Sequence, residues 1–312
     1  MAIFNAESYQ EVSLDWLRFT LKFDNPGNSK AKELYGGFWP CVRAELIEVL
    51  EKTLGVSNGE LIEKTTVKGY DHILKYANGL EMQYHETFSY MGISVELSGD
   101  TLRRYRSTGV TDRELILRLD FEIELPPNDI RDEAVIWKRH GTRVDLAIDY
   151  FNSGINVETL ANKVTRTKTI KVHFLKMNKQ TKEYTENLSA AEAYAHMNDG
   201  VFNTLYIGRP QGEFQVRIYN KLLEQSTKKG GHVPKGVQSW VRAELTFMGD
   251  WPESFIRSAL RVHNDNDFKK LFYLFFLRKM VLKYEPSGRY HDITKDMKKK
   301  AEGAEMVQYS KA

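Results

Sequence analysis

The chain has 312 residues, of which 41% are hydrophobic, and its 45 Lys and Arg against 42 Asp and Glu give a formal net charge of +3. This composition is typical of a folded chain with a packed core and excludes an intrinsically disordered protein. The single cysteine, Cys41, excludes an internal disulfide and a cysteine-based metal cage, and it favours a reducing, cytoplasmic compartment. The longest apolar stretch, 268–281, is too short and too charged to cross a bilayer, so we expect no membrane partner.

The first half of the chain is expected to combine strands with helices. Residues with high strand propensity, or apolar residues that alternate with polar ones, predict strands over 14–23, 67–76, 81–97 and 142–150. Helical spacing and capping signals predict helices over 30–54, from the capping-box pattern at Thr111, and over 132–140, where Gly141 is read as the stop.

The second half of the chain continues the same mixture and ends in helices. Strands are expected over 167–175, 203–207, 213–221 and 239–247. Helices are expected from the cap Asn156 to Lys163, from Ser189 to just before Gly200, and from Trp251 to the end, with Asp267 as a cap.

These elements predict an α+β fold with a large, mostly antiparallel β-sheet and helices packed on one face. We expect residues 1–250 to form one large domain and 251–312 to form a helical C-terminal region. Two strand–turn–helix segments are weakly similar, which two related halves, 1–110 and 111–250, would explain, and chance explains equally well.

Several predicted strands carry apolar residues on one face and charged or phenolic residues on the other, because side chains two apart share a face. A half-exposed sheet explains the alternation by itself. It explains less well why aspartate, which strands disfavour, occurs twice in one short strand. Mg²⁺ or Mn²⁺ coordination would supply a reason, since these ions take hard oxygen ligands. The candidate ligands are Glu96, Asp145 and Glu244, with Asp149 as a fourth.

Tyr219 lies on the polar face of the strand 213–221, between Arg217 and Lys221. A phenol is mostly protonated at neutral pH, so a tyrosine nucleophile needs activation. We expect Arg217 and Lys221 to favour the phenolate, and Arg242 to clamp a phosphate oxygen through its planar fork. The pattern therefore predicts a tyrosine that attacks a phosphodiester.

Two basic stretches without acids flank Tyr219 in the sequence, at 159–182 and 228–242. Such runs are often no more than solvated faces. Two of them around one candidate site favour a polyanionic partner, because Lys and Arg neutralise phosphates. The predicted DNA-binding residues are Lys163, Arg166, Lys168, Lys171 and Lys176.

Four segments in order resemble one family: 142–149 (TRVDLAID), 204–208 (TLYIG), 216–221 (VRIYNK) and 240–245 (WVRAEL). They are similar to the rolling-circle replication initiators of staphylococcal-type plasmids and to the related relaxases of Gram-positive conjugative elements. The resemblance covers about residues 92–247, and the match at Glu96 is looser.

The resemblance implies a bacterial, cytoplasmic, metal-dependent nickase with topoisomerase-like strand transfer. In this family the tyrosine at the position of Tyr219 joins the 5′ end of the nicked strand while the free 3′-hydroxyl primes replication. It also implies that Asp145 and Glu244 hold the metal. The implied partners are plasmid origin DNA, in double-stranded and single-stranded or cruciform form, a host helicase, and a second copy of the chain as a homodimer.

Two alternatives stay open from the sequence. A relaxase of a conjugative element would use the same bond chemistry for DNA transfer. A non-catalytic origin-binding protein would use the sheet face for phosphate contacts and Tyr219 for packing or stacking.

Overall fold

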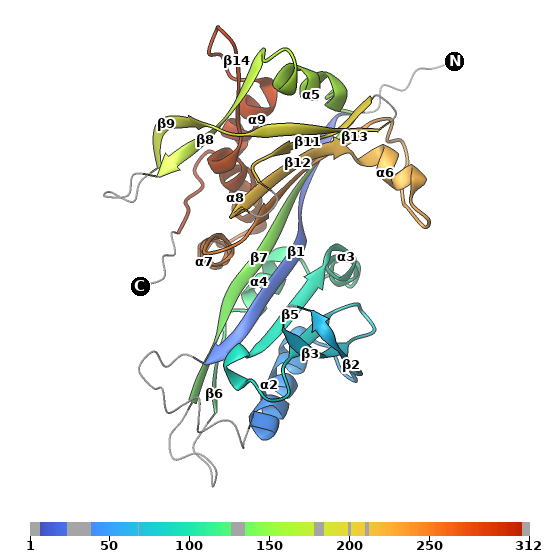
Figure 1. Cartoon of the computed structure of the whole chain (residues 1–312), viewed down its shortest axis with the longest axis vertical. Coiled ribbons are helices and arrows are strands. Elements are labelled where there is room, and N and C mark those ends of the chain that lie inside the picture. Colours follow the sequence, from blue (N-terminus) through green and yellow to red (C-terminus); the bar gives the residue numbers. More distant parts are fainter. Residues whose placement is uncertain are drawn as a thin grey trace. The chain divides into compact units, whose positions relative to one another are not determined.

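The computed structural model of the chain describes residues 7–23, 39–67, 69–125, 135–177, 184–198, 201–209 and 212–307. Its α+β fold, with a large antiparallel sheet, confirms the predicted fold class (Figure 1). Within the described residues this sheet has eleven strands in the order β10-β11-β12-β13-β7-β1-β5-β4-β3-β2, with β6 paired to β7. A second, three-stranded sheet has the order β14-β8-β9.

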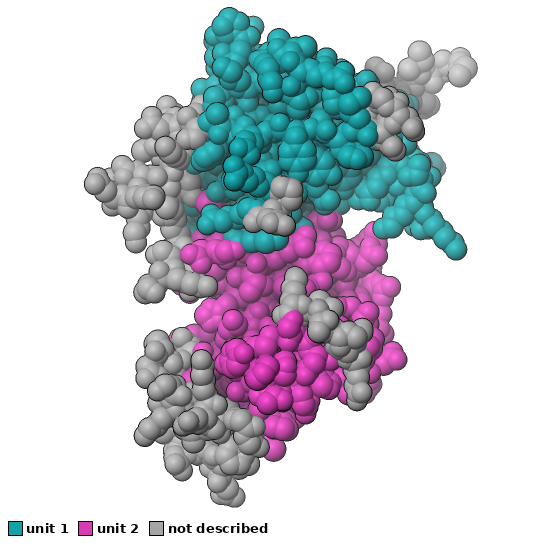
Figure 2. All heavy atoms as spheres, viewed as in Figure 1, with its two compact units in different colours: residues 1–13, 145–248, 262–308 teal, residues 14–144, 249–261, 309–312 magenta. Residues whose placement is uncertain are grey.

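The chain divides into two compact units, shown in different colours in Figure 2. Unit 1 comprises residues 1–13, 145–248 and 262–308, and unit 2 comprises residues 14–144, 249–261 and 309–312. Strands β1 (Tyr9–Phe23) and β7 (Val135–Phe151) contribute residues to both units. The family resemblance makes residues 1–250 the catalytic nicking domain, and this assignment stays a prediction.

Unit 2 packs an antiparallel part of the large sheet against helices. Its other elements are α2 (Trp39–Leu54), β2 (Glu60–Val67), β3 (Tyr70–Lys75), β4 (Glu81–Tyr84), the 3₁₀ helix η1 (Ser89–Met91), β5 (Ile93–Ser98), α3 (Gly99–Ser107), α4 (Asp112–Arg118), β6 (Glu122–Leu125) and α7 (Trp251–Arg261). The core side chains follow strand and helix periodicity: Leu17, Phe19 and Leu21 alternate on β1, and Leu46 and Leu50 recur on α2. The predicted capping box of α4 is confirmed, because Thr111 and Glu114 each accept a hydrogen bond from the other's backbone N–H.

Unit 1 contains the other end of the large sheet and the small sheet. Its elements are α5 (Val157–Thr165), β8 (Ile170–Met177), β9 (Tyr184–Ala190), β10 (Ala193–Asn198), β11 (Val201–Ile207), β12 (Phe214–Asn220), α6 (Lys221–Thr227), β13 (Trp240–Phe247), α8 (Asp265–Lys279), β14 (Val281–Tyr284) and α9 (Asp292–Lys300). The α5 helix begins where predicted, at the cap Asn156, and packs against β10, β11 and β12.

The predicted helix over 132–140 is wrong for its described part, which is the start of β7. Trp137 is buried and stacks on Trp39, with ring centroids 5.8 Å apart, whereas the neighbouring Ile136 is exposed. Gly141 is not a helix stop but a mid-strand residue whose N–H donates to Glu253 of α7 at 3.0 Å. A Cβ at this position would lie about 3 Å from α7, so glycine allows the strand and this helix to approach closely.

The predicted helix from Ser189 to Gly200 is also wrong, because its described residues form the end of β9 and the strand β10. Glu192, the acid of the Ser-x-x-Glu pattern, binds an arginine and does not cap a helix. The Glu192 carboxylate accepts two hydrogen bonds of 3.1 Å from the Arg209 guanidinium, which lies just after β11. Residues 193–198 form a strand because they pair with β11, and the sequence pattern of these residues alone does not reveal that pairing.

Three further expectations need correction. The strand predicted over 81–97 is interrupted by η1, and Gly92 (φ +68°) re-enters the sheet where a Cβ would collide with the carbonyl oxygen of Leu21. The region after Trp251 is not helical throughout, since β14 pairs with β8. The cap of α8 is Asn264, which accepts a hydrogen bond from the backbone N–H of Asp267 at 2.9 Å. No described helix is long and apolar enough to cross a membrane.

Lys279 at the end of α8 gives the chain a testable pH dependence of stability. It is 7% exposed, with Nζ 4.5 Å from the centroid of the Phe214 ring. Burial lowers the pKa of Lys279 from 10.5 to about 8, with Glu213 opposing the shift. Between these pH values the unfolded state binds the additional proton, so this contribution to the free energy of unfolding grows as pH rises from 8 to 10.5.

We expect Lys279→Met to remove this contribution. The stability gained by the variant over the wild type should shrink by about 2 kcal/mol between pH 8 and pH 10. Urea denaturation at several pH values measures this difference, and Lys269→Met, on the exposed face of the same helix, is the control. Parallel pH profiles for wild type and Lys279→Met would contradict the assignment.

Candidate active site

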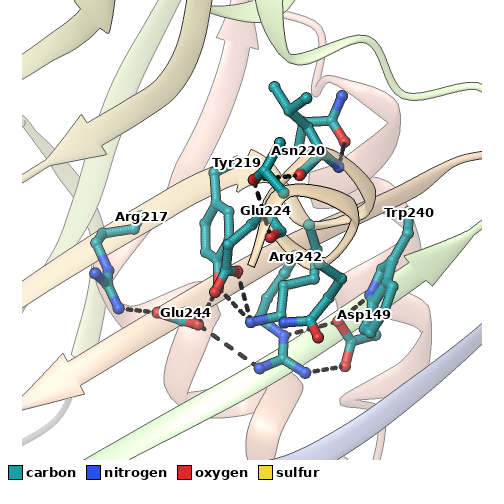
Figure 3. A network of polar contacts seen from close by, with 12 residues as sticks. Asp149, Arg217, Tyr219, Asn220, Glu224, Trp240, Arg242 and Glu244 are labelled. Atoms are coloured by element: carbon teal, nitrogen blue, oxygen red, sulfur yellow. Dashed lines mark hydrogen bonds and ion pairs between the residues drawn. The ribbon is translucent and has the colours of Figure 1, made fainter. Parts of the chain in front are cut away.

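Strands β12 and β13 bring four predicted site residues together on one face of the sheet (Figure 3). Their antiparallel register places Tyr219 opposite Arg242 and Arg217 opposite Glu244. The alternate residues, Val216 and Ile218 on β12 and Ala243 and Leu245 on β13, are buried on the other face. Burial of this apolar set fixes the register, because a slip by one residue would exchange the two faces.

Glu244 is the centre of the network around Tyr219. Its side chain is 3% exposed. One carboxylate oxygen, Oε1, accepts a hydrogen bond of 2.5 Å from the Tyr219 hydroxyl, and the other, Oε2, accepts one from the Arg217 guanidinium. A buried carboxylate is costly unless it is paired, and here a cation and a phenol satisfy it.

The Tyr219 hydroxyl is held in its protonated form by these surroundings. Burial, and next the negative charge of Glu244, raise the pKa of Tyr219 well above its ordinary value, while Arg242 opposes the rise. We expected neighbouring cations to favour the phenolate, but in the protein alone the effects of burial and of Glu244 are larger. Ionisation of Tyr219 needs additional positive charge or transfer of its proton to Glu244 at the moment of reaction.

Lys221 reaches the phenol from the start of α6. The strand β12 ends at Asn220, which caps α6 by accepting a hydrogen bond from the Leu223 N–H at 3.0 Å. Lys221 is therefore the first residue of the helix and not, as predicted, the last of the strand. Its Nζ still lies 3.2 Å from the Tyr219 hydroxyl, and it also pairs with Glu224 at 2.7 Å.

Asp149 on β7 orients Arg242. The guanidinium donates through Nε and Nη2 to the two oxygens of Asp149 at 2.8 and 2.7 Å, and Nη1 lies 3.7 Å from Glu244 Oε1. Trp240 Nε1 donates to the same carboxylate at 2.5 Å. A bidentate pair of this kind fixes the plane of the guanidinium. Sequence reasoning missed Trp240, although its place two residues before Arg242 puts it on the same face.

Asp145 lies on the same strand as Asp149 and in the same unit as Glu244. It is 3% exposed. Burial lowers the pKa of Arg217, but the charges of Glu244, Tyr219 and, more weakly, Asp145 raise it overall. Asp145 and Glu244 are thus two buried carboxylates whose charges both act on Arg217. The described residues contain no cluster of three or more His, Cys, Asp or Glu side chains arranged to hold a metal. Mg²⁺ is commonly bound by one or two carboxylates together with substrate phosphates, so this donor set fits such an ion.

Glu96 belongs to unit 2, whereas the other candidate ligands belong to unit 1. It stands opposite Arg18 in the β1–β5 register and forms an ion pair with it. Burial, and next the charge of Arg143, lower the pKa of Arg18. The structure therefore supplies Glu96 with a partner in its own unit, and a role in metal binding stays a prediction.

The described DNA-binding candidates lie along α5 and the segment that follows it. Lys163 is in the last turn of α5, Arg166 follows as the cap, and Lys168 is in the turn before β8 with φ of +55°. Lys163 and Arg166 line an open pocket of about 460 Å³, where the Arg166 guanidinium lies 4.6 Å from the centroid of the Phe202 ring. Lys171 on β8 is exposed and lies 3.7 Å from Glu285, and the side chain of Lys176 is outside the described residues.

Comparisons with known proteins identify the fold. The structure is similar to that of the rolling circle replication initiator protein from Geobacillus stearothermophilus, with a TM-score of 0.59 and 17% sequence identity over 94% of this chain and 97% of that one. At this identity the similarity concerns the fold alone. No curated protein sequence matches the chain significantly.

The sequence profile described as replication initiation factor (Rep_trans) matches residues 140–296. This range is half of the chain and contains Tyr219, Glu244, Arg242 and both aspartates of β7. It confirms the family resemblance of the four segments and assigns the protein a role in the initiation of replication. The chain is therefore a member of the replication initiation factor family.

Proposed function

We propose that the protein nicks and rejoins one strand of a plasmid replication origin, with Tyr219 as the nucleophile, to initiate rolling-circle replication. The observation that carries the proposal is the hydrogen bond from the Tyr219 hydroxyl to the buried carboxylate of Glu244, with Arg217, Lys221 and Arg242 around it. A phenol that only packed or stacked would not need a buried proton acceptor and three cations. The same bond chemistry would serve a relaxase, but membership of the replication initiation factor family favours the initiator.

The proposed reaction exchanges one phosphate ester for another. The Tyr219 oxygen attacks the phosphorus of the scissile phosphodiester, and the bond from phosphorus to the 3′-oxygen breaks. The phenol proton passes to Glu244 Oε1, with which it already forms a hydrogen bond; the departing 3′-oxygen takes a proton from solvent water, and Glu244 later returns its proton to solvent. The products are a 5′-phosphotyrosyl protein and a free 3′-hydroxyl, and the reverse reaction rejoins the strand.

Three cations can stabilise the charge that develops on the phosphate. Arg242 is held in a fixed plane by Asp149, which suits a guanidinium that clamps phosphate oxygens. Arg217 lies on the side of Glu244 opposite to Arg242 (Figure 3). Lys221 Nζ lies 3.2 Å from the phenol oxygen. The side chain of Arg217 is 41% exposed, so it is accessible to DNA.

A divalent metal, Mg²⁺ or Mn²⁺, belongs to the proposal, with Asp145 and Glu244 as the residues that would hold it. When bound, such an ion would polarise the scissile phosphate and neutralise negative charge beside the phenol. Asp149 is a weaker candidate, because its two oxygens together hold one guanidinium, that of Arg242, as a bidentate pair, whereas the oxygens of Glu244 accept single bonds from two different partners.

We further propose that the partner is origin DNA and that the basic surface of α5 and the following turn contacts its phosphates. Lys163, Arg166, Lys168 and Lys171 are the described residues concerned. From the family resemblance we also propose a homodimer that works with a host helicase.

The experiment that tests the proposed function is to map the modified peptide after nicking. Supercoiled plasmid carrying the cognate origin is incubated with the protein and Mg²⁺ or Mn²⁺, and the denatured adduct is digested with protease and nuclease. We expect one peptide with a nucleotide on Tyr219, and no adduct in the presence of chelator. A nick without a covalent adduct, or an adduct on another residue, would overturn the assignment.

A further inference from the structure

Two stacked tyrosines extend the face that carries Tyr219 towards the edge of the sheet. Tyr194 is on β10 and Tyr206 is on β11, directly opposite each other in the antiparallel register. Their ring centroids are 4.9 Å apart, with 6° between the ring planes. Tyr194 is 42% exposed, although it is a large aromatic side chain.

The register places this pair on the same face as the nucleophile. Tyr206 stands opposite Arg217 on β12, and Thr204 stands opposite Tyr219. The residues on either side of Tyr206, Leu205 and Ile207, are buried on the opposite face. Because side chains two apart share a face, one row runs from Tyr194 through Tyr206 and Arg217 to Glu244. Diagonal neighbours on adjacent antiparallel strands lie about 7–8 Å apart, which brings Tyr206 close to Tyr219.

The Tyr194 side chain extends across the neighbouring strand and is held there. Its hydroxyl accepts a hydrogen bond of 3.1 Å from Gln215 on β12, although β11 lies between the two strands. The ring therefore extends over the sheet face with its plane fixed by Tyr206 on one side. A cross-strand aromatic pair can stabilise a hairpin on its own. An anchored ring, 42% exposed and aligned with a nucleophile, also offers a stacking surface.

We propose that Tyr194 and Tyr206 form a stacking platform for bases of the single DNA strand next to the scissile phosphate. This inference rests on the proposed function and adds how the strand is held. Bases have an aromatic face whatever their sequence, and proteins bind single strands by combining such stacking with cations along the backbone. Arg217, opposite Tyr206, and Arg242, opposite Tyr219, supply the cations.

Another exposed aromatic pair in the chain lacks this charge complementarity. Phe88 and Tyr90 in unit 2 are 45% and 58% exposed, with ring centroids 5.6 Å apart. The neighbouring residues include Glu86, which pairs with Arg43, and Asp71, which pairs with His72. Tyr90 therefore serves as a matched control for removal of an exposed tyrosine ring.

The test measures binding and stacking separately from cleavage. In the full chain carrying Tyr219→Phe, a 12-nucleotide oligo(dT) with one 2-aminopurine reports binding by anisotropy and stacking by fluorescence quenching. We expect Tyr194→Ala and Tyr206→Ala each to weaken binding about 5- to 100-fold and to reduce quenching, as loss of one stacked base requires. Tyr194→Phe and Tyr206→Phe should bind within about twofold of the parent, because stacking needs the ring and not the hydroxyl. Tyr90→Ala should bind like the parent.

Thermal unfolding of each variant identifies any alanine substitution that merely disrupts the hairpin. Tyr194→Leu and Tyr206→Leu, which keep an apolar side chain of similar bulk without an aromatic face, then carry the comparison and should lose quenching as the alanine variants do. Alanine variants that remain folded, bind and quench like the parent would overturn the platform while the Tyr219 adduct still forms in the unsubstituted chain. Absence of an adduct in that chain, together with quenching that depends on Tyr194 and Tyr206, would overturn the proposed nicking and leave the platform standing.

Discussion

Replacement of Tyr219 by phenylalanine is expected to abolish the covalent protein–DNA adduct and to reduce nicking by at least about 10³-fold, the range typical for removal of a nucleophile. The substitution removes one oxygen, and no other described group shares its position between Glu244 and Lys221. Binding of origin DNA should stay within about threefold of wild type, because the cations proposed to contact phosphate are unchanged. Denaturing gel electrophoresis of labelled DNA measures the adduct, and a gel-shift titration measures the binding.

The structural cost of this substitution should be small. Glu244 loses one hydrogen bond but keeps its partner Arg217, and Arg242 lies 3.7 Å away, so we expect a loss of about 1 kcal/mol in the free energy of unfolding. Tyr90→Phe, in unit 2, controls for removal of a tyrosine hydroxyl elsewhere. An adduct of undiminished yield in Tyr219→Phe would transfer the role of nucleophile to another residue.

Much of the site follows from strand alternation, which depends only on the sequence. In 213–221 and 239–247 the apolar residues occur at every second position, and this pattern correctly placed Tyr219, Arg217, Arg242 and Glu244 on one face. Partners could not be predicted in the same way, because they depend on the register between strands. The register brings Tyr219 next to Glu244 and Tyr206 opposite Arg217. It also brings Arg242 within hydrogen-bond distance of both oxygens of Asp149.

The fold shows the same division between local and distant information. The caps Thr111 and Asn156 were predicted correctly, since a cap involves residues only three apart. The helices predicted over 132–140 and 189–199 are wrong for the described residues, 135–140 and 189–198, because the decisive contacts of these residues are distant in the sequence. Trp137 packs on Trp39, and Glu192 is bound by Arg209, 17 residues later. Gly141 was read as a stop, although it accommodates α7, which lies more than 100 residues away in the chain.

Asp149 illustrates how the structure refines a choice that the sequence leaves open. Four acids were candidates for the metal, and their residue types do not distinguish them. The fork of Arg242 and the indole of Trp240 give Asp149 a positioning role. Glu244 instead binds the phenol, and its charge and that of Asp145 both act on Arg217. The three acids of unit 1 should therefore respond differently to substitution.

Glu244→Gln is the second substitution from which we expect a large loss, at least about 10³-fold in nicking, because it removes both the acceptor of the Tyr219 proton and a proposed metal ligand. Asp145→Asn should also lose nicking, and both variants should bind Mn²⁺ at least about tenfold more weakly, as measured by titration with electron paramagnetic resonance detection.

Asp149→Asn is the matched comparison, since it alters another buried carboxylate on the same sheet face and unit. It should bind Mn²⁺ within about twofold of the wild type. Its nicking should fall by about 10- to 100-fold, because an amide replaces the charged carboxylate that holds the Arg242 guanidinium. Thermal unfolding identifies any variant that fails to fold. Wild-type Mn²⁺ affinity in Glu244→Gln would exclude Glu244 as a ligand and leave it the acceptor of the phenol proton, whereas weakened Mn²⁺ binding in Asp149→Asn alone would move the metal to the Arg242 side of the network.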